Sequence, residues 1–200
     1  MSSEELSPRQ RAGATKRRRT REQVLNAARR LFDERGYHAV TVEEISQEAC
    51  VSVPAIYNHF PTKQSVVIGV YAPYVLEIMQ SVERLMVDGH QVDHVITDFM
   101  RRLSIELHAH LAMAYALLSL AQARGTTKYA ESGETASGVS FWQLAEFLGN
   151  LLERSERASR HSIPAVEVAD FYLSGLLTWI VQHPDRSGEE TAAFILAQLL

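Results

Sequence analysis

Cysteine is nearly absent from this sequence: Cys50 is the only one among 200 residues. A single cysteine excludes a disulfide within the chain and a zinc site built on cysteines, and it suits a reducing compartment such as the cytoplasm. Long apolar runs are also missing, because the longest candidate, LAMAYALLSLA at residues 111–121, is shorter than the roughly 18 residues that span a bilayer. The first 21 residues have no apolar core, so we expect no secretory signal there.

Catalytic signatures are missing as well. The sequence has no G-x-S-x-G turn, no H-E-x-x-H motif and no phosphate-binding loop, and no nucleophile stands beside a plausible base. A helical enzyme, the main alternative from another class, is therefore disfavoured, and we expect no cofactor. His90 and His94 have the i, i+4 spacing that can chelate a metal, with Asp93 between them. They lie near an expected helix start, where solvated polar residues are normal, and we predict no metal site.

Charge is unevenly distributed, although the net charge is only −4. Residues 1–65 carry 11 Lys and Arg against 8 Asp and Glu, whereas residues 66–200 carry 9 against 16. The sharpest feature is KRRRTR at residues 16–21. We expect residues 1–19 to be a disordered basic segment, which is either a solvated tail or an arm that contacts DNA phosphates or a minor groove. In the second case its DNA-binding residues are Arg17, Arg18 and Arg19.

The spacing of apolar residues predicts helices almost everywhere after residue 20. Two capping-box patterns, TREQ from Thr20 and TVEE from Thr41, predict the starts of the first two helices. Gly36 is expected to end the first helix. Ser52 and Thr62 are expected to cap a third and a fourth helix.

The third helix has few apolar anchors and many hydrogen-bonding groups. With a turn of about 100° per residue, Val53, Ile56 and Phe60 point inward, and the opposite side presents small and polar residues. Two short helices joined by a tight turn, the second with such a surface, are typical of a DNA-binding helix-turn-helix, although an ordinary helical corner is the alternative. The candidate DNA contacts are Thr41, Ser52, Pro54, Ala55, Tyr57, Asn58, His59 and Lys63, with Thr41, Tyr57 and Lys63 placed for phosphates.

Over about residues 20–68 the sequence resembles the TetR family of bacterial transcriptional repressors. The resemblance rests on AARRLFDERGYHAVTVEEI and on VSVPAIYNHFPTK, which contains the Tyr-x-His-Phe-x-x-Lys run seen in family members. It implies an all-α, Ω-shaped homodimer. Residues 20–65 would form a three-helix DNA-binding head, with residues 52–59 as the recognition helix. Residues 66–200 would bind an effector and dimerise.

Two residues depart from the family pattern. Cys50 stands where the family usually has glycine between the second and third helices. If this residue has a positive φ, the absence of glycine costs about 1 kcal/mol. The turn is then either rebuilt around a redox-reactive thiol or simply tolerates the substitution. Ser46 replaces a frequent alanine, which we interpret as harmless.

The rest of the chain is expected to form helices that begin with a connection from the head. Pro73 lies inside the first of them and should kink or break it, because proline removes one hydrogen bond and clashes with the preceding turn. A segment rich in Gly, Ser and Thr at residues 125–138 is expected to be a mobile loop. The predicted helices span residues 62–88, 91–109, 110–123, 137–159, 164–183 and 188–200.

The helix at residues 168–182 is apolar on most of its circumference, with a polar line only every fourth residue. Such a helix needs cover on two sides, either from a second copy of the chain or as the central helix of a monomer. We predict a homodimer. The candidate interface residues are Phe171, Leu176, Leu177, Trp179, Ile180, Phe194 and Ile195.

Met and aromatic residues are frequent in the same part of the chain. At helical spacing they are either plain core or the lining of a mostly apolar cavity for a hydrophobic or aromatic effector. The candidate lining residues are Met79, Phe99, Leu103, Met113, Phe141, Trp142 and Tyr172.

Together with these patterns, the resemblance to the TetR family implies a cytoplasmic, DNA-binding repressor that an unknown small hydrophobic effector releases from a pseudo-palindromic operator. The alternative is a regulator of the same architecture that activates transcription or acts without a ligand.

Overall fold

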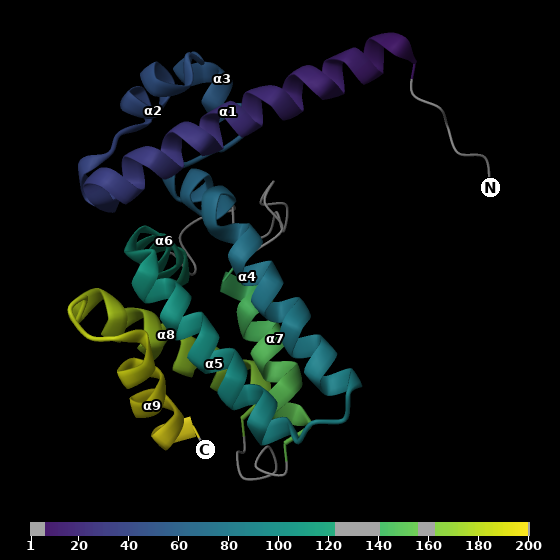
Figure 1. Ribbon diagram of the computed structural model, residues 1–200, viewed down its shortest axis with the longest axis vertical. Helices are drawn as coiled ribbons and strands as arrows, with labels where there is room; N and C mark the ends of the chain where they lie inside the picture. Colours follow the sequence, from purple (N-terminus) through teal and green to yellow (C-terminus); the bar gives the residue numbers. More distant parts are fainter. Residues whose placement is uncertain (1–6, 123–140, 156–162, 200) are drawn as a thin grey trace.

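The computed structural model describes residues 7–122, 141–155 and 163–199, and no strand occurs among them. A head of three helices lies at one end of the molecule, and the long helix α4 leads from it into a body of helices (Figure 1). The all-α fold predicted from the sequence is confirmed. The helices are α1 (Pro8–Ala39), α2 (Val42–Ala49), α3 (Val53–Tyr57), α4 (Lys63–Val87), α5 (Val92–Ala109), α6 (Leu111–Gln122), α7 (Phe141–Glu153), α8 (Ala165–Gln182) and α9 (Gly188–Leu199).

Helix α1 begins thirteen residues earlier than the TREQ pattern predicts, with Ser7 rather than Thr20 as its N-cap. The Ser7 hydroxyl accepts from the N–H of Gln10, and the Gln10 side chain accepts from the N–H of Ser7, so a complete capping box lies at this earlier point. Thr20 therefore lies inside the helix, and the prediction of a disordered segment is wrong for residues 8–19. Residues 1–6 lie outside the described part. Gly36 interrupts the helix with φ 75° and ψ 173°, as the sequence predicts.

Local signals for the other helices of the head are mostly confirmed. Thr41 forms a capping box with Glu44 at the start of α2, and Thr62 forms one with Ser65 at the start of α4. Helix α3 is shorter than the predicted residues 52–59, and Ser52 makes no side-chain capping bond.

Helix α4 continues through Pro73 without a break. By length and composition alone it could cross a membrane, but half of its apolar stretch is buried, as in the core helix of a globular domain. The other body helices follow the predicted spans, except that α7 ends six residues before the predicted residue 159. The predicted loop at residues 125–138 lies outside the described part.

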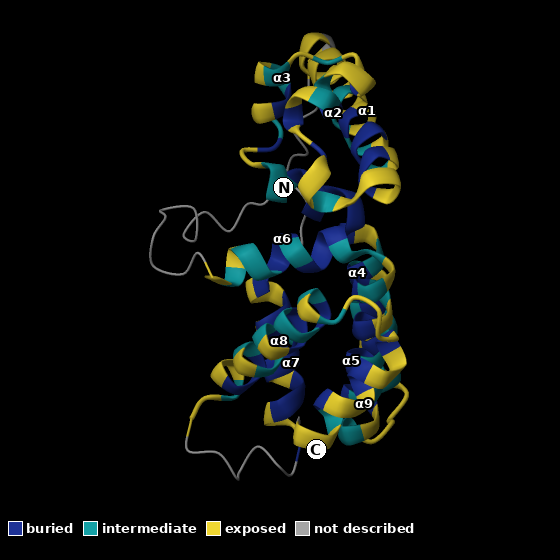
Figure 2. Cartoon of the chain, turned by 90° about the vertical axis from the view of Figure 1, so that its left-hand side faces the viewer, coloured by how far each residue is buried: buried dark blue, intermediate teal, exposed yellow. Residues whose placement is uncertain are grey.

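Buried side chains form one continuous core from Val24 in α1 to Ile195 in α9. Buried and exposed residues alternate along the helices of head and body (Figure 2). Within the body the most extensive packing joins α7 to α8 and α5 to α9. The head is therefore fixed to the body through α1, α4 and α6 rather than hanging on a linker.

Candidate functional site

Helix α3 is held to the head by two buried side chains and exposes the rest of its surface. Ile56 and Phe60 are almost completely buried, and Val53 packs beside them. Tyr57 is 46% exposed. Of the other predicted contacts, Ser52, Pro54 and Asn58 are exposed, and Ala55 and His59 are partly exposed. A short helix with this division can place its polar side against another macromolecule without unfolding the head.

The turn before α3 is fixed by hydrogen bonds that the sequence did not reveal. Cys50 has φ 53° and ψ 40°, so the left-handed conformation expected at a usual glycine position is present with a cysteine. The Ser46 hydroxyl donates to the carbonyl of Val51 at 2.6 Å, and the Val51 N–H donates to the carbonyl of Ser46 at 3.1 Å. Ser46 is therefore a support of the turn rather than a harmless replacement of alanine.

Cations from α1 lie beside the end of α3. The guanidinium of Arg21 lies 5.3 Å from the ring centroid of Phe60. The pKa of His59 is lowered from its ordinary value, first by burial and then by the charges of Arg17 and Arg21. The lowered pKa favours the neutral imidazole, and the charges of Arg17 and Arg21 favour an anionic partner at this place.

The other predicted basic residues of this segment remain on the exposed surface of α1. Arg18 lies 3.7 Å from Glu22, one turn further along the helix. Arg19 is also exposed. The Arg18 side chain can swing toward a partner, because an exposed ion pair of this kind contributes little stability.

Lys63 and Thr41 both make contacts within the head. The Lys63 ammonium donates to the carbonyl of Tyr37 and lies 4.2 Å from the centroid of its ring. Burial lowers the pKa of Lys63, and the nearby Glu44 opposes that shift. The Thr41 hydroxyl is engaged in the capping box of α2. Their predicted phosphate contacts stay predictions, and Tyr37 is a partner that sequence reasoning missed.

Comparison with known proteins identifies the head. A sequence profile of the bacterial regulatory proteins of the tetR family matches residues 24–70. The chain belongs to the TetR family. It is 34% identical over 89 residues to the transcriptional activator FasR of Mycolicibacterium smegmatis, covering 44% of this chain and 37% of FasR. It is 30% identical over 84 residues to the regulator UidR of Escherichia coli K12, and the match covers 38% of this chain and 39% of UidR. The chain thus matches less than two-fifths of the length of these relatives.

Solved structures extend the likeness in fold to most of the chain. The structure of FadR from Thermus thermophilus, a TetR-family repressor in complex with lauroyl-CoA, superposes with a TM-score of 0.69 at 20% identity, covering 90% of this chain and 92% of FadR. The structure of RolR in complex with resorcinol superposes with a TM-score of 0.59 at 18% identity, and the match covers 92% of this chain and 89% of RolR. At these identities the likeness shows the fold alone.

A polar cluster joins head to body in this TetR-family chain. The Tyr71 hydroxyl on α4 donates to the Asp33 carboxylate on α1 at 2.9 Å. Arg29 on α1 donates to the Tyr74 hydroxyl and to the carbonyl of Val70, both at 3.2 Å. The latter carbonyl lies next to that of Gly69, which loses its helical partner because Pro73 has no N–H. Periodicity could not reveal this cluster, because its partners lie about forty residues apart.

The predicted ligand-lining residues do not all come together. Phe99, Leu103, Met113 and Phe141 lie in the buried core, and Met79 packs against it. The other two lie toward the surface. Trp142 is 39% exposed, and the hydroxyl of Tyr172 donates to the carbonyl of Gln198 on α9.

Cavities lined by described residues lie elsewhere. One of about 570 Å³ opens between the head and the α5–α6 corner, and its walls include Tyr37, Tyr71 and Tyr115. A second, of about 310 Å³, lies between α4 and α5, and a third, of about 230 Å³, lies beside Trp179 and Phe194. Helical periodicity does not predict these cavities, because each is formed where separate helices meet.

The predicted dimer residues divide into two groups. Leu176, Leu177, Ile180 and Ile195 are buried within the chain's own core, which corrects their assignment to an interface. Phe171 is 73% exposed and Phe194 is 47% exposed. Trp179 stacks on Phe194 with ring centroids 4.5 Å apart. Helix α8 thus buries the aliphatic side chains that the pattern assigned outward and exposes aromatic ones.

The histidine pair beside the start of α5 brings its rings together. The rings of His90 and His94 stack with centroids 5.7 Å apart. Within the described residues, no group of three or more His, Cys, Asp and Glu side chains could hold a metal.

Proposed function

We propose that this chain is a DNA-binding transcriptional regulator in which α3 is the recognition helix. The observation that carries the proposal is the exposed polar side of α3, which is mounted on Ile56 and Phe60 at the end of the molecule distant from α7 and α9 (Figure 1). The match of residues 24–70 to the TetR-family profile supports it. A helix of this kind enters a major groove with its N-terminal residues toward base edges.

The functional unit in this proposal is a homodimer. Trp179 on α8 stacks on Phe194 on α9, and Phe171 on α8 is 73% exposed; a second copy would cover these aromatic side chains. Two heads then lie in successive major grooves, and the operator is a pseudo-palindrome with half-sites about 34–36 Å apart or a little more. The protein would act in the cytoplasm, where its DNA is.

A small, mostly apolar ligand would release the DNA. Phe99, Leu103 and Met113 are fully buried, so a ligand among them must displace packed side chains, and Met is the most adaptable of these. The acyl chain of the lauroyl-CoA bound to FadR and the aromatic ring of the resorcinol bound to RolR support an apolar part in such a ligand. A ligand shifts the protein toward a DNA-free state only by its higher affinity for that state.

The first test is fluorescence anisotropy with DNA from the upstream region of the protein's own gene, beside scrambled DNA of equal length. We expect a preference of about 10³-fold or more for the former. Tyr57→Ala and His59→Ala should each weaken specific binding by about 5- to 150-fold, since a lost contact costs about 1–3 kcal/mol. Val87→Ala, at an exposed site at the far end of α4, is the control and should bind normally. Normal affinity in both head variants would refute the recognition-helix assignment.

Activation is a second candidate, because FasR, a relative at 34% identity, is an activator. In vitro transcription from the bound promoter separates the two. Repression predicts less transcript when the protein is added and recovery with the ligand, whereas activation predicts more transcript.

A further inference from the structure

The first turns of α1 form a helical arm, residues 8–20, that projects beyond the rest of the head (Figure 1). Residues 7–20 contain six cations and no acidic residue. The side chains of residues 9–19 are all exposed. At 1.5 Å per residue the arm is roughly 18 Å long, the length of about five base pairs.

The arm is continuous with the DNA-reading surface. Arg17, near its inner end, is close enough to affect the titration of His59 at the end of α3. Arg21, in the following turn, lies over Phe60. The cations Arg9 and Arg11 then lie about 10–14 Å further along the helix axis than Arg17 or Arg18.

The arm has little to stabilise it as a helix besides its cap and its connection to α1. Its cations lie on all sides of the helix, so no apolar face is available for packing, and like charges on successive turns repel one another. Gly13 further weakens its interior, where an added Cβ would meet no atom within 4 Å. Because the packed part of α1 supplies the nucleus, the arm needs only helix propagation, and a polyanion beside it would remove the repulsion.

We propose that the helical arm binds DNA phosphates on the duplex that flanks the half-site read by α3. This inference rests on the proposed function. It adds that the protein covers a longer stretch of DNA than the head alone would contact. Charge complementarity and continuity with α3 select duplex DNA as the partner. Arg9, Arg11 and Lys16 are the residues that carry the flank contact.

The test compares a variant with a matched control on two DNA lengths. The arm variant is Arg9→Gln/Arg11→Gln/Lys16→Gln, and the control is Arg84→Gln/Arg154→Gln/Arg186→Gln, which removes the same charge from exposed sites outside the head. One duplex ends at the half-sites of the operator, and the other extends by six or more base pairs at each end.

Each lost phosphate contact lowers the slope of log K against log salt by about 0.9, so the arm variant should lose up to about 2.7 on the long duplex. Between 50 and 200 mM salt the parent protein should correspondingly lose up to about 40-fold more affinity than the arm variant. On the short duplex the arm variant and the control should agree. Equal behaviour of the two on the long duplex, or an equal loss for the arm variant on both duplexes, would overturn the inference.

A second pair of variants keeps every charge and tests the helix. Gly13→Ala should bind the long duplex at least as tightly as the parent, and Gly13→Pro should bind it more weakly because proline breaks the arm. Parent-like binding by Gly13→Pro would show that a helical arm is not the contact. If the parent itself does not prefer its upstream DNA to scrambled DNA, the proposed function fails. If it does and the arm variants match it, only the flank contact fails.

Discussion

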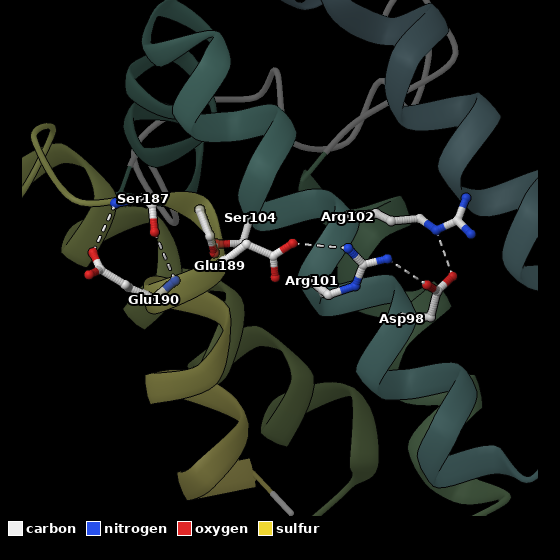
Figure 3. Close-up of polar contacts among 8 residues, drawn as sticks. Asp98, Arg101, Arg102, Ser104, Ser187, Glu189 and Glu190 are labelled. Atoms are coloured by element: carbon white, nitrogen blue, oxygen red, sulfur yellow. Dashed lines mark hydrogen bonds and ion pairs between the residues drawn. The ribbon is translucent and has the colours of Figure 1, made fainter.

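The head and the body of this chain are specified in different ways. In and beside the head, residues close together in the sequence determine where helices begin. Thr41 with Glu44 caps α2, and Thr62 with Ser65 caps α4. In the body, distant residues determine how helices meet, as where the Ser104 hydroxyl on α5 donates to the carbonyl of Gly188 at 2.9 Å, beside the ion pairs of Arg101 (Figure 3). Short-range patterns can therefore identify the head, whereas the body takes its shape from contacts between residues far apart in the chain.

The largest effect is expected from removing the anchor of α3. Ile56→Ala deletes a fully buried side chain and should lower the free energy of unfolding by about 2–5 kcal/mol. Because Ile56 is one of two fully buried side chains between Ile45 and Val66, operator binding should fall with it. Urea denaturation followed by circular dichroism, together with DNA anisotropy, measures both.

Leu107→Ala in α5 is the matched control for that change. It removes an equally buried side chain from the body and should cost a similar free energy of unfolding. DNA affinity should nevertheless be preserved below its unfolding transition. If both variants lose DNA binding equally, the packing of the body determines DNA affinity as much as the packing of the head does.

The next largest effect concerns the close approach of α9 to α5. A Cβ at Gly188 would lie 2.4 Å from Cα and 2.7 Å from N of Ile105, both of which are backbone atoms. Gly188→Ala should therefore displace α9 and cost about 1–3 kcal/mol in thermal or chemical unfolding. DNA affinity of the folded protein should change little.

Gly175→Ala provides the contrast for Gly188→Ala. Gly175 lies on the exposed side of α8, and no atom lies within 4 Å of its added Cβ. The substitution should raise the free energy of unfolding by up to about 1 kcal/mol through helix propensity. A loss of stability there would instead indicate that another copy packs against α8 at that point, and a neutral result for Gly188→Ala would contradict the packing we describe.

Sequence reasoning succeeded where the signal was local and failed where several local signals competed. The outward surface of α3 followed from the spacing of Val53, Ile56 and Phe60. The start of α1 was misplaced because Thr20 and Ser7 both begin capping patterns, and nothing in the pattern alone tells which one is used. On α8 an almost entirely apolar circumference does not specify which side faces the core, so Leu176 was assigned outward although it is buried. The head–body cluster was missed because it depends on tertiary contacts.

A smaller effect is expected at the junction of head and body. Tyr71→Phe removes the donor to Asp33 and should cost about 0.5–1.5 kcal/mol, the usual net contribution of a hydrogen bond. Burial, with the hydrogen bond and charge of Asp33, raises the pKa of Tyr71, so the hydroxyl stays protonated and remains a donor through neutral pH. A double-mutant cycle with Asp33→Ala isolates the pair, and strictly additive effects would show that the contact does not couple head to body.

The smallest effect is expected at the turn before α3, and it tests the local character of the head most directly. Cys50 has a positive φ without being glycine. Cys50→Gly relieves that backbone strain of about 1 kcal/mol, but the greater freedom of glycine in the unfolded chain offsets part of it, so the net gain should be a few tenths of a kcal/mol. Differential scanning calorimetry at matched protein concentration measures the change.

Gly89→Ala is the converse of that change. Gly89 has φ 82°, and an added Cβ would meet no atom within 4 Å, so its expected loss of about 1 kcal/mol arises from backbone conformation alone. If Cys50→Gly keeps full operator affinity, the left-handed turn matters and the thiol does not. If it stabilises the protein but weakens DNA binding, the side chain of Cys50 itself contributes at the interface. DNA binding by the head would then depend on the Cys50 thiol, whose role does not follow from the left-handed backbone at that position.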